Sequence, residues 1–178
     1  EQRYVCVSRP RRFGKSITAR MIAAYYRRGC DSAELFGGCK IASAEDFRQH
    51  LNQYCVIQLD IAELKITMPK CEDFVQYLQK CVIDELRDIY PEIVTQTASS
   101  LPLTLAELNA KTGDRFVIII DEWDMIFREE NYNKKSQDDY INLLRGLFKG
   151  EKSQRFMNLA YLTGILPIKR YNNESALN

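Results

Sequence analysis

The sequence predicts an α/β fold in which a mainly parallel sheet lies between two layers of helices, and three observations support this prediction. Short apolar, β-prone runs alternate along the chain with stretches of helical periodicity. Residues 116–120 are all apolar, which is typical of a strand that is buried on both faces of a parallel sheet. Of the 178 residues, 46% are hydrophobic and 28% are charged, a balance that allows a sizeable core and excludes a disordered chain.

The first half of the chain is predicted to alternate strands and helices. Residues 4–8 form an apolar β-prone run, and after a basic loop the helical pattern resumes until Gly29, a plausible helix stop. Ser43 is expected to cap a short helix over residues 43–51, and residues 55–61 are expected to form the second strand.

The second half is predicted to contain three helices and two strands, over residues 69–91, 104–113, 116–121, 136–150 and 157–162. Pro69 suits the first turn of the longest of these helices. Thr104 and Glu107 fit a capping box, and Ser136 is expected to cap the helix that Gly150 ends.

The loop after the first strand matches the second half of the phosphate-binding pattern G-x-x-x-x-G-K-[ST], or Walker A motif. Gly14 would let backbone amides approach phosphate oxygens, Lys15 would bridge the β and γ phosphates, and Ser16 would ligate Mg²⁺ at the helix N-terminus. Arg9 stands where the first glycine is usual, and Pro10, with its fixed φ, is expected to set a modified start of the loop. The alternative is that Gly-Lys-Ser is simply a common tripeptide at a helix start.

The residues around this tripeptide extend the predicted nucleotide-binding site. We include Arg11, Arg12, Phe13 and Ile17 in this site with Gly14, Lys15 and Ser16. The arginines at positions 9, 11 and 12 are expected to contact phosphate or a neighbouring domain, and the alternative is a solvated surface cluster.

Two acidic residues follow the buried run and therefore emerge at the carboxyl end of a central strand, where ligands bind in parallel α/β sheets. Asp121 would hold Mg²⁺, and Glu122 would orient and activate an attacking water, as in a Walker B motif. Acidic residues also often simply end strands. With the phosphate loop before them and a strand between, they indicate a nucleoside triphosphate site in a P-loop NTPase of the additional-strand, catalytic-glutamate branch, with the choice between ATP and GTP left open.

Two more polar residues near strand ends have open roles. Asp124 would support the metal shell from behind or serve as a loop carboxylate. Thr163 would face the γ phosphate as a catalytic polar sensor, or it would satisfy local backbone at the strand end.

Three segments closely resemble the AAA-ATPase-like family, also called predicted AAA-ATPase: S-R-P-R-R-F-G-K-S over residues 8–16, I-D-E-W-D over 120–124, and 162–178. The resemblance covers nearly the whole chain and makes Arg9 a family trait. It implies a three-layer P-loop NTPase sandwich over residues 1–178 that binds and hydrolyses ATP through Lys15, Ser16, Asp121 and Glu122. We expect this domain to be incomplete and to be an excerpt of a longer chain with an attached effector domain. In proteins of the family that it resembles, the domain that commonly follows is a PD-(D/E)XK nuclease-like domain.

The chain departs from the family pattern after the acidic pair. Trp123 stands where Tyr is frequent, and Met125 and Ile126 replace a more usual charged residue and proline. These changes leave the metal chemistry intact and affect the geometry of the loop after Asp124.

Our leading hypothesis is an ATPase that couples its nucleotide state to the attached effector domain. We expect slow hydrolysis from this excerpt, because base contacts before the first strand and a fifth strand are missing. Whether an arginine finger is supplied in trans stays open, and its lack alone would lower the rate by ~10³-fold or more. The runner-up is an ATP-dependent signalling switch with negligible turnover. The third hypothesis is a small-molecule kinase whose lid would use four basic residues that are equally explained as surface charge: Arg145, Arg155, Lys169 and Arg170.

Composition excludes several other classes. The net charge of +1 gives no chain-wide field for nucleic acid or an anionic membrane, and no apolar stretch is long enough to span a bilayer. The six cysteines form no C-x-x-C pair and fall mostly in apolar periodic segments, as expected for reduced core thiols of a cytoplasmic protein. With His50 as the only histidine, neither a Cys/His zinc site nor a Ser/His/Asp triad is expected. The oligomeric state stays open.

Overall fold

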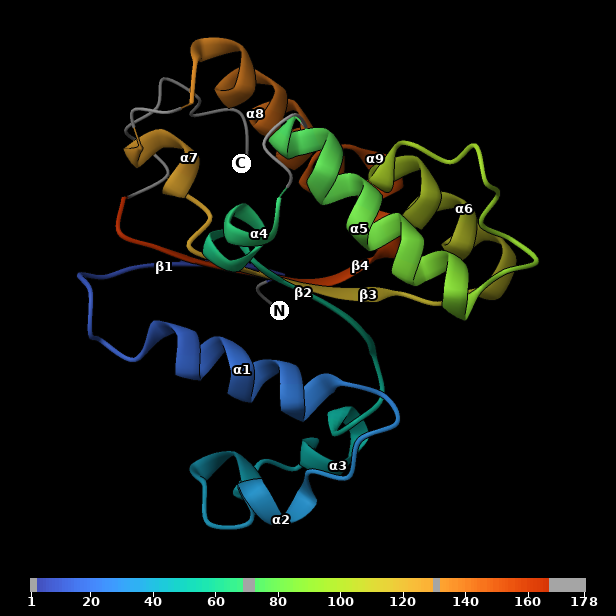
Figure 1. Ribbon diagram of the computed structural model, residues 1–178. Helices are drawn as coiled ribbons and strands as arrows, with labels where there is room; N and C mark the ends of the chain where they lie inside the picture. Colours follow the sequence, from blue (N-terminus) through green and yellow to red (C-terminus); the bar gives the residue numbers. More distant parts are fainter. Residues whose placement is uncertain (1–2, 69–72, 130–131, 167–178) are drawn as a thin grey trace.

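The computed structural model describes residues 3–68, 73–129 and 132–166 and contains a parallel four-stranded sheet between two layers of helices (Figure 1). The strands lie in the order β1-β4-β3-β2. Their bounds are Tyr4–Ser8 for β1, Cys55–Asp60 for β2, Phe116–Asp121 for β3 and Met157–Gly164 for β4. The predicted α/β fold with a parallel sheet is therefore confirmed.

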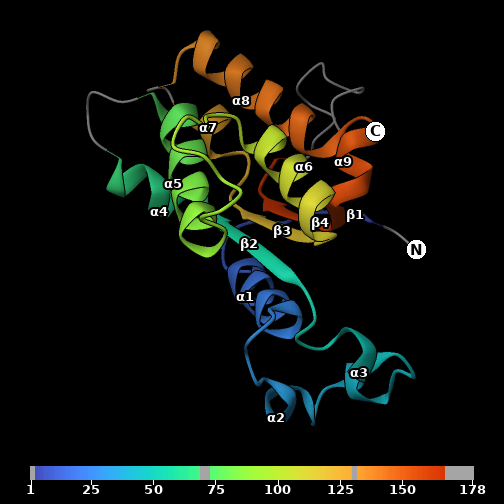
Figure 2. The ribbon, with the colours of Figure 1, turned by 90° about the vertical axis from the view of Figure 1, so that its right-hand side faces the viewer.

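Helix α1 (Lys15–Tyr26) covers one face of the sheet. Its buried residues Ala19 and Ala23 pack against Val117, Ile119 and Tyr161 of the two central strands. The small alanine side chains let the helix approach the sheet closely. Beyond α1 lie three short elements (Figure 2), which are α2 (Ala33–Phe36), the 3₁₀ helix Lys40–Ser43 and α3 (Phe47–His50).

The opposite face carries the larger core. Its helices are α4 (Ile61–Thr67), α5 (Phe74–Ile89), α6 (Leu101–Thr112), α7 (Met125–Arg128), α8 (Lys134–Phe148) and α9 (Glu151–Phe156). Leu78, Leu105 and Leu108 of this layer are at most 1% exposed and belong to one cluster with Ile118 and Ile120 of β3. Because helices cover both faces of β3, all six of its residues are buried, which explains the uninterrupted apolar run in the sequence.

Three predicted helix caps are wrong, because each of these helices begins at another residue than expected. Asn133 caps α8 by accepting the amide of Ser136 at 2.9 Å, so Ser136 lies inside the helix. Helix α6 begins at Leu101, so Thr104 lies in its first turn and donates its hydroxyl to the carbonyl of Ser100 at 2.9 Å. Ser43 ends the 3₁₀ helix, and α3 begins only after Asp46.

The connection between β2 and α5 contains a helix that the sequence did not predict. Asp60 at the end of β2 caps α4 by accepting the amides of Ala62 and Glu63 at 3.0 and 3.1 Å. Helix α5 then begins at Phe74 behind its cap Asp73. Pro69, the expected start of this helix, lies outside the described residues.

The described cysteines are not paired with one another, but their expected core placement is wrong. Cys6 and Cys30 are exposed, and Cys39, Cys55 and Cys81 are half-buried. No helix in the described ranges is both long and apolar enough to cross a membrane.

Candidate functional site

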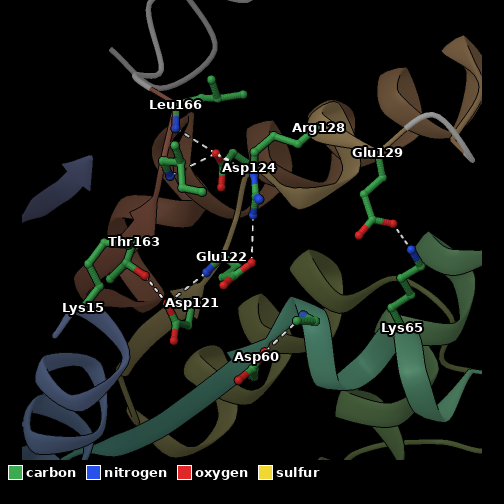
Figure 3. Close-up of polar contacts among 12 residues, drawn as sticks. Lys15, Asp60, Lys65, Asp121, Glu122, Asp124, Arg128, Glu129, Thr163 and Leu166 are labelled. Atoms are coloured by element: carbon green, nitrogen blue, oxygen red, sulfur yellow. Dashed lines mark hydrogen bonds and ion pairs between the residues drawn. The ribbon is translucent and has the colours of Figure 1, made fainter. Parts of the chain in front are cut away.

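The carboxyl ends of β1, β4 and β3 meet at one edge of the sheet, and the predicted site residues follow these ends (Figure 3). Ser8 at the end of β1 is in register with Gly164, and Ile120 is in register with Leu162. The loop that leaves β1, the end of β4 and the acidic pair after β3 are therefore neighbours, although more than 100 residues separate the first from the others.

Main-chain contacts hold the predicted phosphate loop against the end of β4. The amide of Arg9 donates to the carbonyl of Gly164 at 3.1 Å. The ammonium of Lys15 turns back across its own loop and donates to the carbonyls of Arg9 and Pro10, both at 2.9 Å. The loop is thus already curled around the charged group that is expected to meet phosphate.

The N-terminus of α1 faces the same edge with backbone amides that make no hydrogen bond inside the helix. The first hydrogen bond of the helix runs from the amide of Thr18 to the carbonyl of Gly14 at 2.9 Å, so the amides of residues 15–17 have no partner within the helix. Gly14 has a φ of 74°, which suits the tight turn into the helix, and the first turn carries no acidic residue. Free amides and the positive end of the helix dipole favour an anion at this position.

Asp121 lies at the end of β3 and is held by two donors on one oxygen. Its Oδ1 accepts the hydroxyl of Thr163 and the amide of Glu122, the latter at 3.0 Å. Thr163 is fully buried, so its hydroxyl contacts Asp121 and is not open to a phosphate in this structure. Its predicted role as a phosphate sensor stays a prediction.

Asp121 and Ser16 offer a carboxylate and a hydroxyl oxygen, the hard donors that Mg²⁺ prefers. Within the described residues no hydrogen bond occupies Oδ2 of Asp121, and no group of three or more His, Cys, Asp or Glu side chains forms a metal cage. Mg²⁺ needs only a few ligands from the protein, because it commonly keeps several waters and binds substrate phosphates. The donor set therefore fits this ion.

Glu122 has an unusual backbone and a charged partner. Its φ is 53°, a left-handed conformation that non-glycine residues rarely adopt and that clusters at functional sites. Its Oε2 accepts Nη2 of Arg128 at 2.8 Å.

Asp124 is fully buried and joins the loop after β3 to the segment after β4. Its Oδ2 accepts the amides of Ile165 and Leu166 at 3.0 and 2.8 Å and lies 3.1 Å from Nε of Arg128. These contacts make Asp124 a structural anchor between the loop after β3 and the segment after β4.

The family model for predicted AAA-ATPase matches residues 1–172. The chain belongs to this family. A comparison with curated proteins found no match. Membership in a predicted AAA-ATPase family indicates nucleotide binding, and the loop and acidic pair described above are the parts of this family member suited to it.

Four residues predicted for the nucleotide site are exposed, and one basic residue weighed for a kinase lid lies at the opposite edge of the sheet. Phe13 and Ile17 are 67% and 66% exposed, and Arg11 and Arg12 are also exposed. Arg155 precedes β4 and so lies toward the amino ends of the strands, opposite the edge where the acidic pair lies.

The other candidates for alternative chemistry also have their own surroundings. Arg145 on α8 donates to Asn142 at 3.3 Å, and Lys169 and Arg170 lie outside the described residues. His50 on α3 contacts the hydroxyl of Tyr54 at 2.5 Å and lies 3.5 Å from Asp46, in the small layer beyond α1.

Arg128 is the residue of the site that sequence reasoning missed, because no helix was predicted between the strand at residues 116–121 and the helix at residues 136–150. Asp124 and Arg128 are four residues apart, which brings their side chains together once α7 forms. That spacing was the available signal.

Proposed function

We propose that this chain binds ATP with Mg²⁺, hydrolyses it, and couples its nucleotide state to an attached effector domain. One observation carries the proposal: the phosphate loop at the N-terminus of α1 and the pair Asp121 and Glu122 lie at the same edge of a parallel sheet. Ligands of such sheets bind at the carboxyl ends of the strands. The family assignment supports the nucleotide.

Different groups of the chain would bind the phosphates and the Mg²⁺ ion. The free amides of residues 15–17 would donate to phosphate oxygens, and Lys15 would exchange its bonds to the Arg9 and Pro10 carbonyls for bonds to phosphate. Ser16 and Asp121 would hold Mg²⁺, and Thr163 would keep the Asp121 carboxylate aimed. Bound Mg²⁺ would neutralise charge that develops on the phosphate oxygens.

Glu122 would act on the attacking water. The water oxygen forms a bond to the γ phosphorus while the bond from that phosphorus to the bridging oxygen breaks and leaves its electron pair on ADP. The proton that the water loses passes to the Glu122 carboxylate. Within the described residues the Oε1 atom of Glu122 has no partner, so it is the oxygen available for this proton.

Binding is tested by calorimetry of Mg-ATP with Lys15→Ala. Loss of two charge-assisted hydrogen bonds should weaken binding by roughly 10²-fold or more. Lys152→Ala is the matched control, because Lys152 is an exposed lysine on α9, away from the loop. Unchanged affinity in a folded Lys15→Ala variant would remove the phosphate-loop assignment.

Hydrolysis is tested by single-turnover release of phosphate from bound ATP, comparing the wild type with Glu122→Gln. The amide keeps the size of the side chain but accepts no proton, so the rate should fall by about 10²–10⁴-fold while Mg-ATP stays bound. Equal rates would make Glu122 a structural residue. Tight binding without measurable release by the wild type would favour the signalling switch over the ATPase.

A further inference from the structure

Arg128 at the end of α7 lies between two carboxylates of the loop after β3 (Figure 3). Its Nη2 donates to Oε2 of Glu122 at 2.8 Å, and its Nε lies 3.1 Å from Oδ2 of Asp124. The Arg128 side chain is only 15% exposed, so solvent screens these two ion pairs less than it screens surface pairs.

Asp124 gives this arginine a fixed position relative to the sheet. The Asp124 side chain is fully buried and accepts the amides of Ile165 and Leu166, which directly follow β4. The guanidinium is therefore tied to the end of a central strand on one side and to Glu122 on the other. Because the guanidinium is rigid and planar, its contact with Asp124 also fixes the position of the Glu122 carboxylate.

Glu122 needs such a partner because acids surround it. Asp121 directly precedes it, Asp124 lies two residues further on, and Asp60 is in register with Asp121 on the neighbouring strand. Like charges at these positions would drive an unpaired Glu122 side chain away from the sheet edge. Its half-exposed side chain has room to move, since 35% of its surface is accessible.

We propose that Arg128 is a positioning residue that holds Glu122 by Oε2 and leaves Oε1 facing the attacking water. This inference rests on the proposed function, because it assigns a partner to the residue that activates the water. The contacts of Arg128 in the structure are with Glu122 and Asp124, so the proposal gives it no bond to phosphate or metal. Its effect on hydrolysis passes entirely through Glu122.

The test compares Arg128→Gln and Arg128→Lys with the wild type in calorimetry of Mg-ATP and in single-turnover hydrolysis at saturating Mg-ATP. Arg128→Gln should lower the single-turnover rate by about 10-fold or more, since small misplacements of a catalytic group cost up to about 10²-fold. The dissociation constant of Mg-ATP should stay within about twofold. Lysine keeps the charge but cannot reach both carboxylates with one planar group, so Arg128→Lys should recover part of the rate.

A double-mutant comparison separates positioning from a merely structural role. On the Glu122→Gln background, Arg128→Gln should cause no further loss, because the residue through which it acts is already disabled. Arg155→Gln, a change at an exposed residue of α9, is the control that should leave rate and affinity unchanged. If Arg128→Gln fails to fold, Arg128→Lys carries the same comparison.

Four results would overturn the inference. They are an unchanged rate in Arg128→Gln, a faster rate, weaker Mg-ATP binding that accounts for the whole loss, or an equal loss on the wild-type and Glu122→Gln backgrounds. Absence of hydrolysis by the wild type would overturn the proposed function together with this inference. The wild-type measurement therefore distinguishes the two failures.

Discussion

Asp124 should contribute far more to stability than an ordinary loop carboxylate, and replacing it by alanine should lower the free energy of unfolding by about 3–5 kcal/mol. The hydrogen bonds and the ion pair of Asp124 give this magnitude. Two backbone amides donate to its fully buried carboxylate at 3.0 and 2.8 Å, and each such bond to a charged group is worth about 1.5–3 kcal/mol. Arg128 also loses one of its two partners, although Glu122 continues to neutralise it.

Asp124→Asn refines this prediction, because the carboxamide oxygen can still accept both amides while the charge opposite Arg128 is lost. We expect a smaller cost of about 1–2 kcal/mol. Urea unfolding followed by the fluorescence of Trp123 measures both variants, since Trp123 is the only tryptophan and is 3% exposed. Asp138→Ala removes an exposed partner of Lys134 and should change stability by no more than about 0.5 kcal/mol.

The opposite result would return Asp124 to the metal site. If Asp124→Ala unfolds at the same urea concentration as the wild type but ATP binding no longer depends on Mg²⁺, then the anchor argument fails. The carboxylate would then support the metal shell, which is the other role that the sequence leaves open.

Two further predictions concern stability. Gly164→Ala should lower the free energy of unfolding by about 1–3 kcal/mol in urea, because a Cβ would lie 2.7 Å from Oδ1 of Asp124 and 2.7 Å from Nε1 of Trp123. Gly38→Ala is the control, because a Cβ there meets nothing within 4 Å. A comparable loss in Gly38→Ala would contradict the steric argument. Burial tends to raise the pKa of Asp114, but hydrogen bonds from Arg28 at 2.9 Å and Tyr90 at 2.8 Å outweigh it and the pKa is lowered. The ionised Asp114 therefore stabilises the folded state fully above its unfolded-state pKa of about 3.9, and this contribution is lost as the pH falls through the lower folded-state pKa. Urea unfolding from pH 7 to pH 2.5 should show the difference between the wild type and Asp114→Asn shrinking below about pH 4, and a constant difference would contradict this account.

The sequence predicts the sheet well because the sheet's core is encoded locally. Residues 116–121 read as a strand without reference to any other segment, and the structure buries all six. The loop before α1 is similarly local, since a strand, a basic Gly-Lys-Ser segment and a helix follow one another directly. The strand order β1-β4-β3-β2 was not predicted, because it depends on pairing between segments that are far apart in the chain.

The short helices and their caps were not predictable in the same way, because several neighbouring residues compete for each role. Asn133 and Ser136 are both good cap residues, and Asn133 caps α8 by accepting the amide of Ser136. Helix α7 has only four residues, too few for a periodic pattern. The contacts that define Asp124 join it to amides 41 and 42 residues away, and a single sequence carries no local signal for such pairs.

The segment just after β4 joins the two halves of the proposed site. Leu166 accepts the hydroxyl of Ser8 at the start of the phosphate loop, at 3.0 Å, and donates its amide to Asp124 beside the acidic pair. A rearrangement of the phosphate loop would act on Leu166 through Ser8. A movement of Arg128, the partner of Glu122, would act on Leu166 through Asp124, since Arg128 lies against the same Asp124 oxygen. A physical route for coupling requires an element whose arrangement both sites bias. Through residues 165 and 166, the chain immediately after β4 contacts both the start of the phosphate loop and the carboxylate that anchors Arg128, which are the contacts that such a route would need.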